Sequence, residues 1–222
     1  PTVVPPTAPA ITARTSTGVS VAAQVPSTSI VLPTDGSIRL VDVGGGVIAS
    51  NTLTVPNQGT YTLNRTTGVI TFQPVLGFTG VASPVRWRVW DSFNQSSNIT
   101  TYTPTVAAPS APSASPKTST GPRDTAQTVT VTPPSGGSVR LLDGSNNVVT
   151  GDSLTVSGEG TYTINHTTGL VTFTPEAGYF GVPTTVSYRV IDAYNQTADS
   201  TYSPEVLPEA VPLTSTGVGT EV

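Results

Sequence analysis

The chain has 222 residues with a formal net charge of −4, and only 10% of its residues are charged. It contains no cysteine, which excludes disulfides and thiolate metal sites, and its single histidine argues against imidazole-based catalysis or metal binding. The acidic balance argues against a nucleic-acid-binding protein. The 21 glycines and 21 prolines argue against a helical bundle, so we expect an all-β protein. We expect no cofactor.

Two similar units follow one another in the sequence. Residues 36–95 align without gaps with residues 137–196, and almost half of the aligned positions are identical. Self-similarity at a fixed spacing is typical of a repeat protein. Because each unit is long enough to bury its own core, we expect two domains.

The edges of the units are marked by a recurring Thr-Ser-Thr-Gly motif, which begins at Thr15, Thr118 and Thr214. The opening residues, Pro1 to Val3, resemble the end of each complete unit. We therefore expect two whole repeats from a longer array. The predicted division is the tail of an upstream repeat with a linker at 1–14, the first repeat at 15–106, a linker at 107–117, the second repeat at 118–206, and a linker with the start of a third repeat at 207–222.

The linker at 107–117 is rich in alanine, proline and serine, and a comparable stretch precedes the first repeat. Such segments favour the extended polyproline II conformation and act as semi-rigid spacers. Part of each segment could instead pack as the first strand of the following repeat. A stiff spacer predicts that the repeats are arranged end to end and do not pack side by side.

Apolar and polar residues alternate over short stretches of each unit, which is the pattern of strands with one buried face. A strand is expected at 127–132 in the second unit, and the corresponding strand of the first unit is expected around Ile30 and Leu32. Trp87 and Tyr188 lie within such stretches and are expected in the cores. Further strands of the second unit are expected at 139–143, 154–156, 160–164, 170–173 and 186–190.

The connection from Asn165 to Gly169 has the length and the final glycine of a type I turn followed by a G1 bulge, and Gly68 ends the same turn in the first unit. Glycine adopts a positive φ at no steric cost, so we expect positive φ at both glycines. The segment from Gly178 to Gly181 is expected to cross between sheets. Seven or eight such strands in each unit predict two tandem Ig-like antiparallel β-sandwich domains joined by Pro-rich linkers.

The ordered motifs of both units resemble the CshA-type fibril repeat of Gram-positive bacterial fibrillar surface adhesins. In the first unit these motifs are Gly-Thr-Tyr-Thr, Thr-Gly-Val-Ile-Thr-Phe-x-Pro, Gly-Phe-x-Gly, Arg-Val-x-Asp and Thr-Tyr-x-Pro-x-Val. The second unit has the same series, with Leu-Val in place of Val-Ile and Tyr in place of Phe in the second and third motifs. The resemblance covers both units almost end to end, so it implies two tandem copies. It further implies a secreted protein of the bacterial cell surface, attached to the cell wall, in which the repeats form a fibril behind an adhesive domain.

Few residues suggest a chemical site. Asp91 and Asn94, with Asp192 and Asn195, recur at a strand end, where carboxylate and amide oxygens are suited to Ca²⁺. The alternative, which we favour, is that these side chains bond to the local backbone and stabilise a turn, so that no metal site exists. His166 is expected to be an ordinary turn residue.

Arg86, Arg88 and Trp90 share the face of their expected strand opposite Trp87. If exposed, they form a candidate contact patch for a glycan or a protein. Because Ile191 keeps an apolar residue at the place of Trp90 in the second unit, partial cover by a neighbouring strand or loop is the favoured interpretation.

We therefore expect a structural, non-enzymatic role in cell adhesion, in which the repeats form a stalk that extends an adhesive tip away from the cell. The expected partners are neighbouring repeats of the same chain and, through a tip domain outside these residues, a host glycoprotein, with no nucleic acid and no membrane insertion. One alternative is that the repeats themselves bind host glycoprotein or carbohydrate. Another is an accessory module of a secreted polysaccharide hydrolase.

Overall fold

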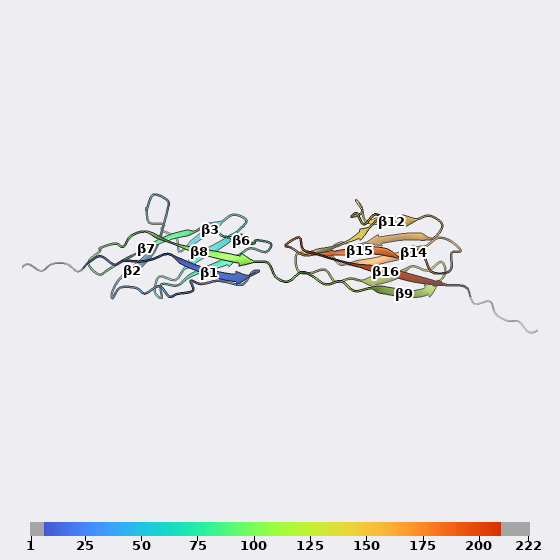
Figure 1. The fold of residues 1–222 in the computed structure, drawn as a ribbon, viewed down its shortest axis with the longest axis horizontal. Helices are drawn as coiled ribbons and strands as arrows, with labels where there is room; N and C mark the ends of the chain where they lie inside the picture. The colour runs from blue at the N-terminus through green and yellow to red at the C-terminus, as the bar shows by residue number, and fades with distance from the viewer. Residues whose placement is uncertain (1–6, 210–222) are drawn as a thin grey trace, which may run out of the picture. The chain divides into compact units, whose positions relative to one another are not determined.

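The structure, a computed structural model, describes residues 7–209 and divides the chain into two compact units, with the boundary between Ser110 and Ala111 (Figure 1). The expected tail of an upstream repeat at Pro1 to Val3 and the expected third repeat from Thr214 lie outside the described residues. The described part of the chain contains strands and no helix, and hence no helix that is able to span a membrane.

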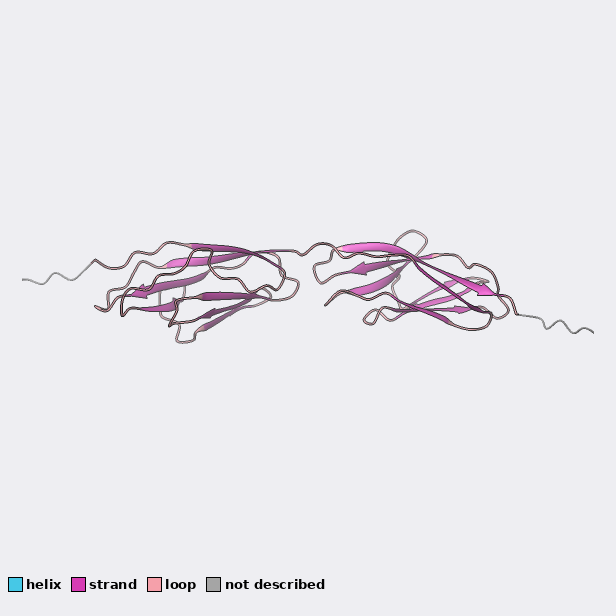
Figure 2. Cartoon of the chain, turned by 90° about the horizontal axis from the view of Figure 1, so that it is seen from below, coloured by secondary structure: helices cyan, strands magenta, loops and turns pink. Residues whose placement is uncertain are grey.

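The first unit is a sandwich of two sheets (Figure 2). One sheet contains, in spatial order, β1 (Arg14–Val19), β8 (Thr100–Ala107), β7 (Val85–Trp90) and β2 (Ser37–Val41), and β6 (Gly80–Val81) pairs with β8. The other sheet contains β3 (Thr52–Val55), β4 (Gly59–Leu63) and β5 (Ile70–Pro74).

The second unit repeats this architecture with the same number of strands. One sheet contains, in spatial order, β11 (Ser138–Leu142), β15 (Val186–Ile191), β16 (Thr197–Leu207) and β9 (Lys117–Pro122). The other contains β10 (Gln127–Thr130), β14 (Leu170–Pro175), β13 (Gly160–Ile164) and β12 (Ser153–Val156). The chain changes sheets between β14 and β15, so the crossing expected at Gly178 to Gly181 is confirmed.

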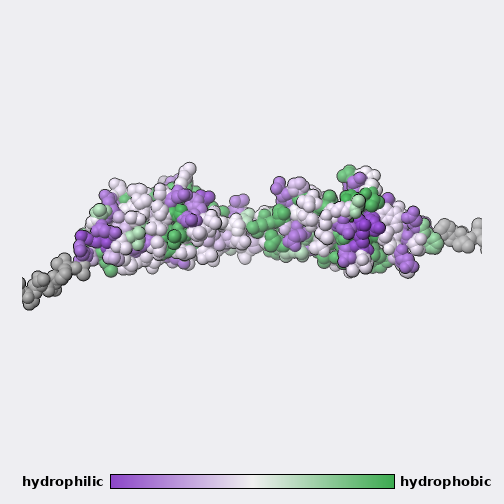
Figure 3. Space-filling model, turned by 180° about the vertical axis from the view of Figure 1, so that it is seen from behind, coloured by the Kyte–Doolittle hydropathy of each residue, from purple (hydrophilic) through white to green (hydrophobic). Residues whose placement is uncertain are grey.

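Each unit encloses its own hydrophobic core between its two sheets. In β7, buried and half-buried residues alternate, so that Trp87 enters the core while its neighbours on either side face outward. Tyr188 of β15 is buried in the same way. The alternation in the sequence therefore correctly predicted the inward faces, and the Ig-like sandwich fold is confirmed. On the side of the molecule visible in Figure 3, hydrophobic side chains form small separate areas among polar ones.

The hairpin turns contain the predicted glycine conformations, with φ of +76° at Gly68 and +68° at Gly169. The predicted turn type is wrong. The Gly68 N–H donates to the carbonyl of Asn64 at 2.9 Å, and Gly169 bonds to Asn165 in the same way at 2.8 Å. These bonds span four residues instead of the three of a type I turn, although the turn of the second unit occupies the expected residues, Asn165 to Gly169.

The first unit lacks the strand expected around Ile30 and Leu32. Only Gln24 pairs with β5, through two backbone hydrogen bonds of 2.8 Å to Phe72. In the second unit the equivalent Gln127 begins β10, which continues for three more residues. Pro26 interrupts the pairing in the first unit because it has no N–H to donate.

One pair of strands in each otherwise antiparallel sandwich runs parallel. In each unit the first strand pairs in parallel with the last, β1 with β8 and β9 with β16. Each of these strands extends into residues assigned from the sequence to linkers, because β1 begins at Arg14, β8 ends at Ala107, β9 begins at Lys117 and β16 ends at Leu207.

The residues before each first strand pack on their own unit without forming a strand. Ile11 contacts the first core and Ala114 contacts the second. The amide side chain of Asn98 accepts a bond of 3.1 Å from the backbone N–H of Ile11 and donates one of 2.9 Å to its carbonyl. In the second unit the hydroxyl of Tyr188 donates to the carbonyl of Ser115. Part of each Pro-rich segment thus belongs to the following unit.

Candidate functional site

The parallel pair of terminal strands contains a buried polar network in each unit. In the first unit, β1 and β8 are paired from Arg14 opposite Tyr102 to Val19 opposite Ala107. Ser16 points inward from β1 and is 9% exposed, while Tyr102 on β8 is fully buried. Polar side chains at these places require hydrogen-bond partners, because a buried unpaired polar group costs free energy.

The partners come from three segments of the unit. The Ser16 hydroxyl donates to the side-chain carbonyl of Gln24 at 2.7 Å and lies 2.7 Å from the Tyr102 hydroxyl. The Gln24 amide then donates to the backbone carbonyl of Thr105 at 3.2 Å. Burial raises the pKa of Tyr102, which keeps its hydroxyl protonated and able to donate to Ser16.

The second unit contains the same network. Ser119 donates to Gln127 at 2.5 Å and lies 2.7 Å from the Tyr202 hydroxyl, and Gln127 donates to the carbonyl of Glu205 at 2.9 Å.

The glycine of Thr-Ser-Thr-Gly leaves room for the glutamine, since a Cβ on Gly18 would lie 2.7 Å from the Gln24 side chain. Sequence reasoning did not find this network, although the joint recurrence of Thr-Ser-Thr-Gly and Thr-Tyr-x-Pro-x-Val in both units was a signal of it.

The calcium candidates form turns whose oxygens bond to the local chain. Oδ1 of Asp91 accepts the backbone N–H groups of Phe93 at 2.9 Å and Gln95 at 2.8 Å, and Oδ2 accepts the Gln95 side-chain amide at 3.2 Å. Asn94 has a φ of +60°, a value that asparagine tolerates in turns.

Asp192 and Asn195 repeat this turn in the second unit, where Asp192 accepts bonds of 2.8 Å from the backbone N–H groups of Tyr194 and Gln196. No cluster of three or more histidine, aspartate or glutamate side chains that could hold a metal occurs among residues 7–209. The geometry of all four residues is therefore explained by the turn.

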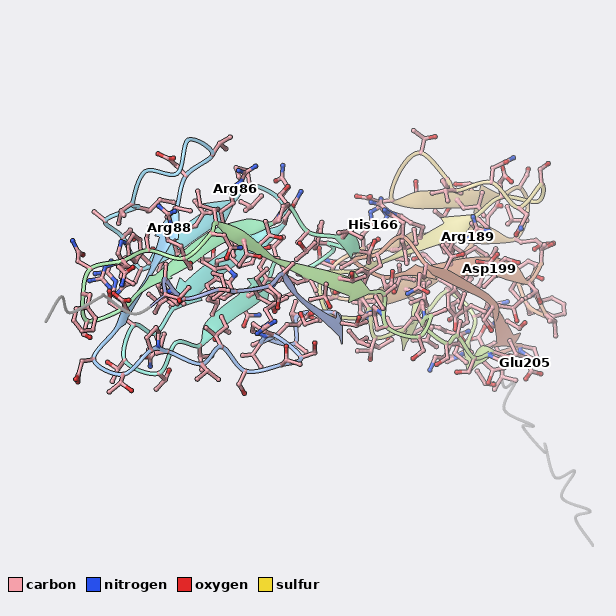
Figure 4. All side chains as sticks on the ribbon, turned by 60° about the vertical axis from the view of Figure 1, so that its left-hand side comes forward. Arg86, Arg88, His166, Arg189, Asp199 and Glu205 are labelled. Atoms are coloured by element: carbon pink, nitrogen blue, oxygen red, sulfur yellow. The ribbon has the colours of Figure 1, made fainter. Side chains whose placement is uncertain are left out.

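Arg86, Arg88 and Trp90 lie on the outer face of β7 and are half-buried (Figure 4 shows the two arginines). The guanidinium carbon of Arg88 lies 5.6 Å from the centre of the Trp90 ring. Arg88 donates to the carbonyl of Ser97 at 2.9 Å, and Arg86 makes a longer bond of 3.4 Å to the carbonyl of Val43. The structure thus groups the three predicted residues on one face.

Sequence reasoning missed a fourth member of this group. In the pairing of β2 with β7, Arg39 lies directly opposite Arg88. Like charges in this position destabilise a sheet unless they are neutralised.

In the second unit the corresponding pair is Arg140 and Arg189, and Arg189 is neutralised by a carboxylate. Arg189 and Asp199 form two hydrogen bonds of 2.7 Å across adjacent strands (Figure 4). Arg140 bonds to the ring of His166, whose Nε2 lies 3.4 Å from a carboxylate oxygen of Asp152. His166 is therefore more than a turn residue, since its ring contacts the guanidinium of Arg140.

The second unit should lose more stability in acid than the first. The hydrogen bonds from Arg189 hold the pKa of Asp199 below its ordinary value of 3.8. A carboxyl group whose pKa is lower in the folded than in the unfolded state stabilises the fold fully at a pH above the pKa of the unfolded state, here about 3.8. This stabilisation is lost as the pH falls from 3.8 through the lower pKa of the folded state. We expect Asp199→Asn to reduce the acid-induced fall in the melting temperature of the second unit, as measured by calorimetry. A wild-type acid response in this variant would contradict the assignment.

Two segments of the chain, residues 4–106 and 109–206, each match the family described as the repetitive domain of the surface adhesin CshA. No curated protein matches the chain as a whole or in part at a significant level.

Among solved structures, the titin domains Z1Z2 in complex with telethonin are 15% identical over 89% of this chain and 94% of theirs, with a TM-score of 0.46. Mouse cadherin-23 EC22–24 is 12% identical, with 89% of this chain and 62% of that chain covered and a TM-score of 0.33. An endo-fucoidan hydrolase of glycoside hydrolase family 107 is 10% identical over 88% of this chain and 28% of its own, with a TM-score of 0.34.

Proposed function

Because the chain belongs to the family of the CshA surface adhesin repetitive domain, with one copy in each unit, we propose that it forms part of the stalk of an adhesin. As an adhesin repeat, the chain belongs outside the cell, at the cell surface. The stalk would extend an adhesive tip away from the surface, and its attachment to the cell wall is part of the proposal.

One observation supports the stalk role above all others, the parallel pairing of the first and last strands of each unit. In the first unit, Arg14 lies beside Tyr102, and five residues later Val19 lies beside Ala107. The chain therefore arrives at one end of this sheet and leaves from the opposite end. With antiparallel terminal strands, the chain would arrive and leave at the same end, and a repeat would add little length.

The self-contained cores support the same role. Each unit buries its own cluster of aromatic and aliphatic side chains between its own sheets. Such a unit has the size of a domain that folds by itself. The number of copies in an array can then vary without loss of stability, which suits a protein whose function depends on length.

The stalk role is tested by the length of arrays that contain increasing numbers of this two-repeat segment. We expect the length in electron micrographs to rise linearly, and each repeat to add at least about 17 Å, the span of six residues in a parallel strand. The control is the same array in denaturant, where the regular increment should vanish. Compact particles whose diameter grows only slowly with the number of repeats would contradict the proposal.

A further inference from the structure

The outer face of β2 and β7 in the first unit carries positive charge that no carboxylate neutralises. Arg39 and Arg88 lie directly opposite each other, and Arg86 follows on β7. Their hydrogen bonds go to backbone carbonyls, of Ile38, Ser97 and Val43. Every ion pair within residues 7–209 lies in the second unit. The Nε atom of Arg88 is buried and has no hydrogen-bond partner.

The difference between the units extends to their net charge. The first unit, up to Ser110, contains five arginines and three aspartates, and so has a net charge of +2. The second unit contains four basic and ten acidic residues, for a net charge of −6, and the two values add up to the −4 of the chain. An anion approaching the chain is therefore attracted to the first unit and repelled by the second.

A shallow depression lies on this face, lined by Ser37, Arg39, Val47, Trp90 and Asn94. Its lining combines a hydroxyl, an amide, a guanidinium group and a half-buried indole ring. An indole face packs against the C–H face of a sugar ring, while hydroxyl and amide groups bond to sugar hydroxyls. A guanidinium group pairs with a carboxylate or sulfate.

We propose that this face of the first unit is a binding site for acidic carbohydrate, a sugar that carries a carboxylate or sulfate group. Arg39, in the lining of the depression, binds the anionic group, Trp90 stacks on the ring, and Arg88 beside Trp90 adds to the positive charge of the site. The site is independent of the stalk role and adds a binding activity to one of the two repeats.

The second unit lacks the site because of three differences on an otherwise similar surface. Serine, arginine, valine and asparagine recur at the equivalent positions of the depression, but Ile191 replaces Trp90. The guanidinium of Arg189 is bound by Asp199, and that of Arg140 contacts His166. The second unit is thus a natural control within the same chain.

Acidic carbohydrate fits this face better than an acidic protein does. A specific protein interface usually buries more than about 1,000 Å² and centres on several apolar anchors. The depression here is lined by five residues, of which only Val47 is an exposed aliphatic side chain. A small ring with polar groups on its edge matches these dimensions.

The test is a titration of the full 222-residue chain with sialyllactose, sulfated lactose and lactose at low salt. The only tryptophans are Trp87, which is buried, and Trp90, so quenching of tryptophan fluorescence reports on the site directly. We expect at least one acidic sugar to bind with Kd below about 10 mM and lactose to bind at least about tenfold more weakly. The comparison of the two acidic sugars shows whether carboxylate or sulfate is preferred.

The variants Trp90→Ile and Arg88→Gln should each weaken binding by about tenfold or more, as measured by calorimetry. Trp90→Ile introduces the residue that the second unit has at this position, so the sheet should tolerate it. The control Arg189→Gln should leave the affinity unchanged. Rising salt should weaken binding of the acidic sugars.

Several results would overturn the proposal. These are equal affinity for lactose and the acidic sugars, no binding of either acidic sugar up to about 10 mM, and wild-type affinity in both site variants. Self-association of the chain that Arg88→Gln abolishes would also overturn it, since the face would then be an interface between copies. None of these results alters the length of the arrays that test the stalk role.

Discussion

Replacing Gly169 by valine is expected to destabilise the second unit by about 4 kcal/mol, which is most of the free energy of unfolding of a domain at the lower end of the usual range of about 5 to 15 kcal/mol. Gly169 has a φ of +68°, where a β-branched residue costs about 1 to 3 kcal/mol. In addition, a Cβ would lie 1.7 Å from the carbonyl oxygen of Val131, a backbone atom that cannot move alone. Relieving this overlap requires a shift of the neighbouring chain, at a further cost of about 1 to 3 kcal/mol.

The equivalent change in the first unit, Gly68→Val, is the matched control. A Cβ there would lie 3.2 Å from the Leu32 side chain and 3.3 Å from the carbonyl oxygen of Ile30, so the overlap is far smaller and the conformational cost of about 1 to 3 kcal/mol dominates. Both tryptophans belong to the first unit, so urea denaturation followed by fluorescence reports on that unit and circular dichroism on both. Equal destabilisation by the two changes would show that the contact with Val131 has no energetic effect.

The second large effect is expected for Ser16→Ala, which should destabilise the first unit by about 3 kcal/mol. The change removes one hydroxyl but leaves two buried groups without a partner, the Tyr102 hydroxyl and the side-chain carbonyl of Gln24. Each unsatisfied buried group costs about 1 to 3 kcal/mol. The midpoint of urea unfolding, followed by tryptophan fluorescence, measures the loss.

Three further variants separate the network from other effects on β1. Thr17→Ala changes an exposed neighbour on the same strand and should cost less than about 0.5 kcal/mol. Ser119→Ala in the second unit should cost less than Ser16→Ala, because Ser119 is partly exposed. Adding Tyr102→Phe to Ser16→Ala should restore part of the stability, since it removes one unpaired group. A purely additive double variant would refute the coupling of these side chains.

The sequence was sufficient to predict which residues of each strand face inward. Trp87 and Tyr188 are buried as expected, because the side-chain alternation of a strand depends only on the local backbone. Positive φ at Gly68 and Gly169 was likewise predictable, because the preference of glycine for this region is local. The missing strand near Ile30 was partly readable from Pro26, whose effect on pairing was overlooked.

Features that depend on distant pairing were not predictable. The alternation of residues in β1 is the same whether its partner runs parallel or antiparallel, so the partner in β8 could not be inferred from Arg14–Val19. For the same reason Arg39 was not placed beside Arg88, because the register of β2 against β7 is set by the packing of the whole sheet. The local pattern correctly placed Arg86, Arg88 and Trp90 on one face of β7.

The parallel pairing of β1 with β8 determines how a repeat responds to a pulling force. Tension applied at the two ends of the unit draws β1 and β8 in opposite directions along their common axis. The hydrogen bonds between them run across that axis, so the bonds of all six paired positions are sheared together and none can open alone. The bond between Ser16 and Tyr102 crosses the same boundary. Each repeat therefore resists extension most strongly along the boundary between its first and last strands, and under tension it keeps its length until the whole boundary gives way.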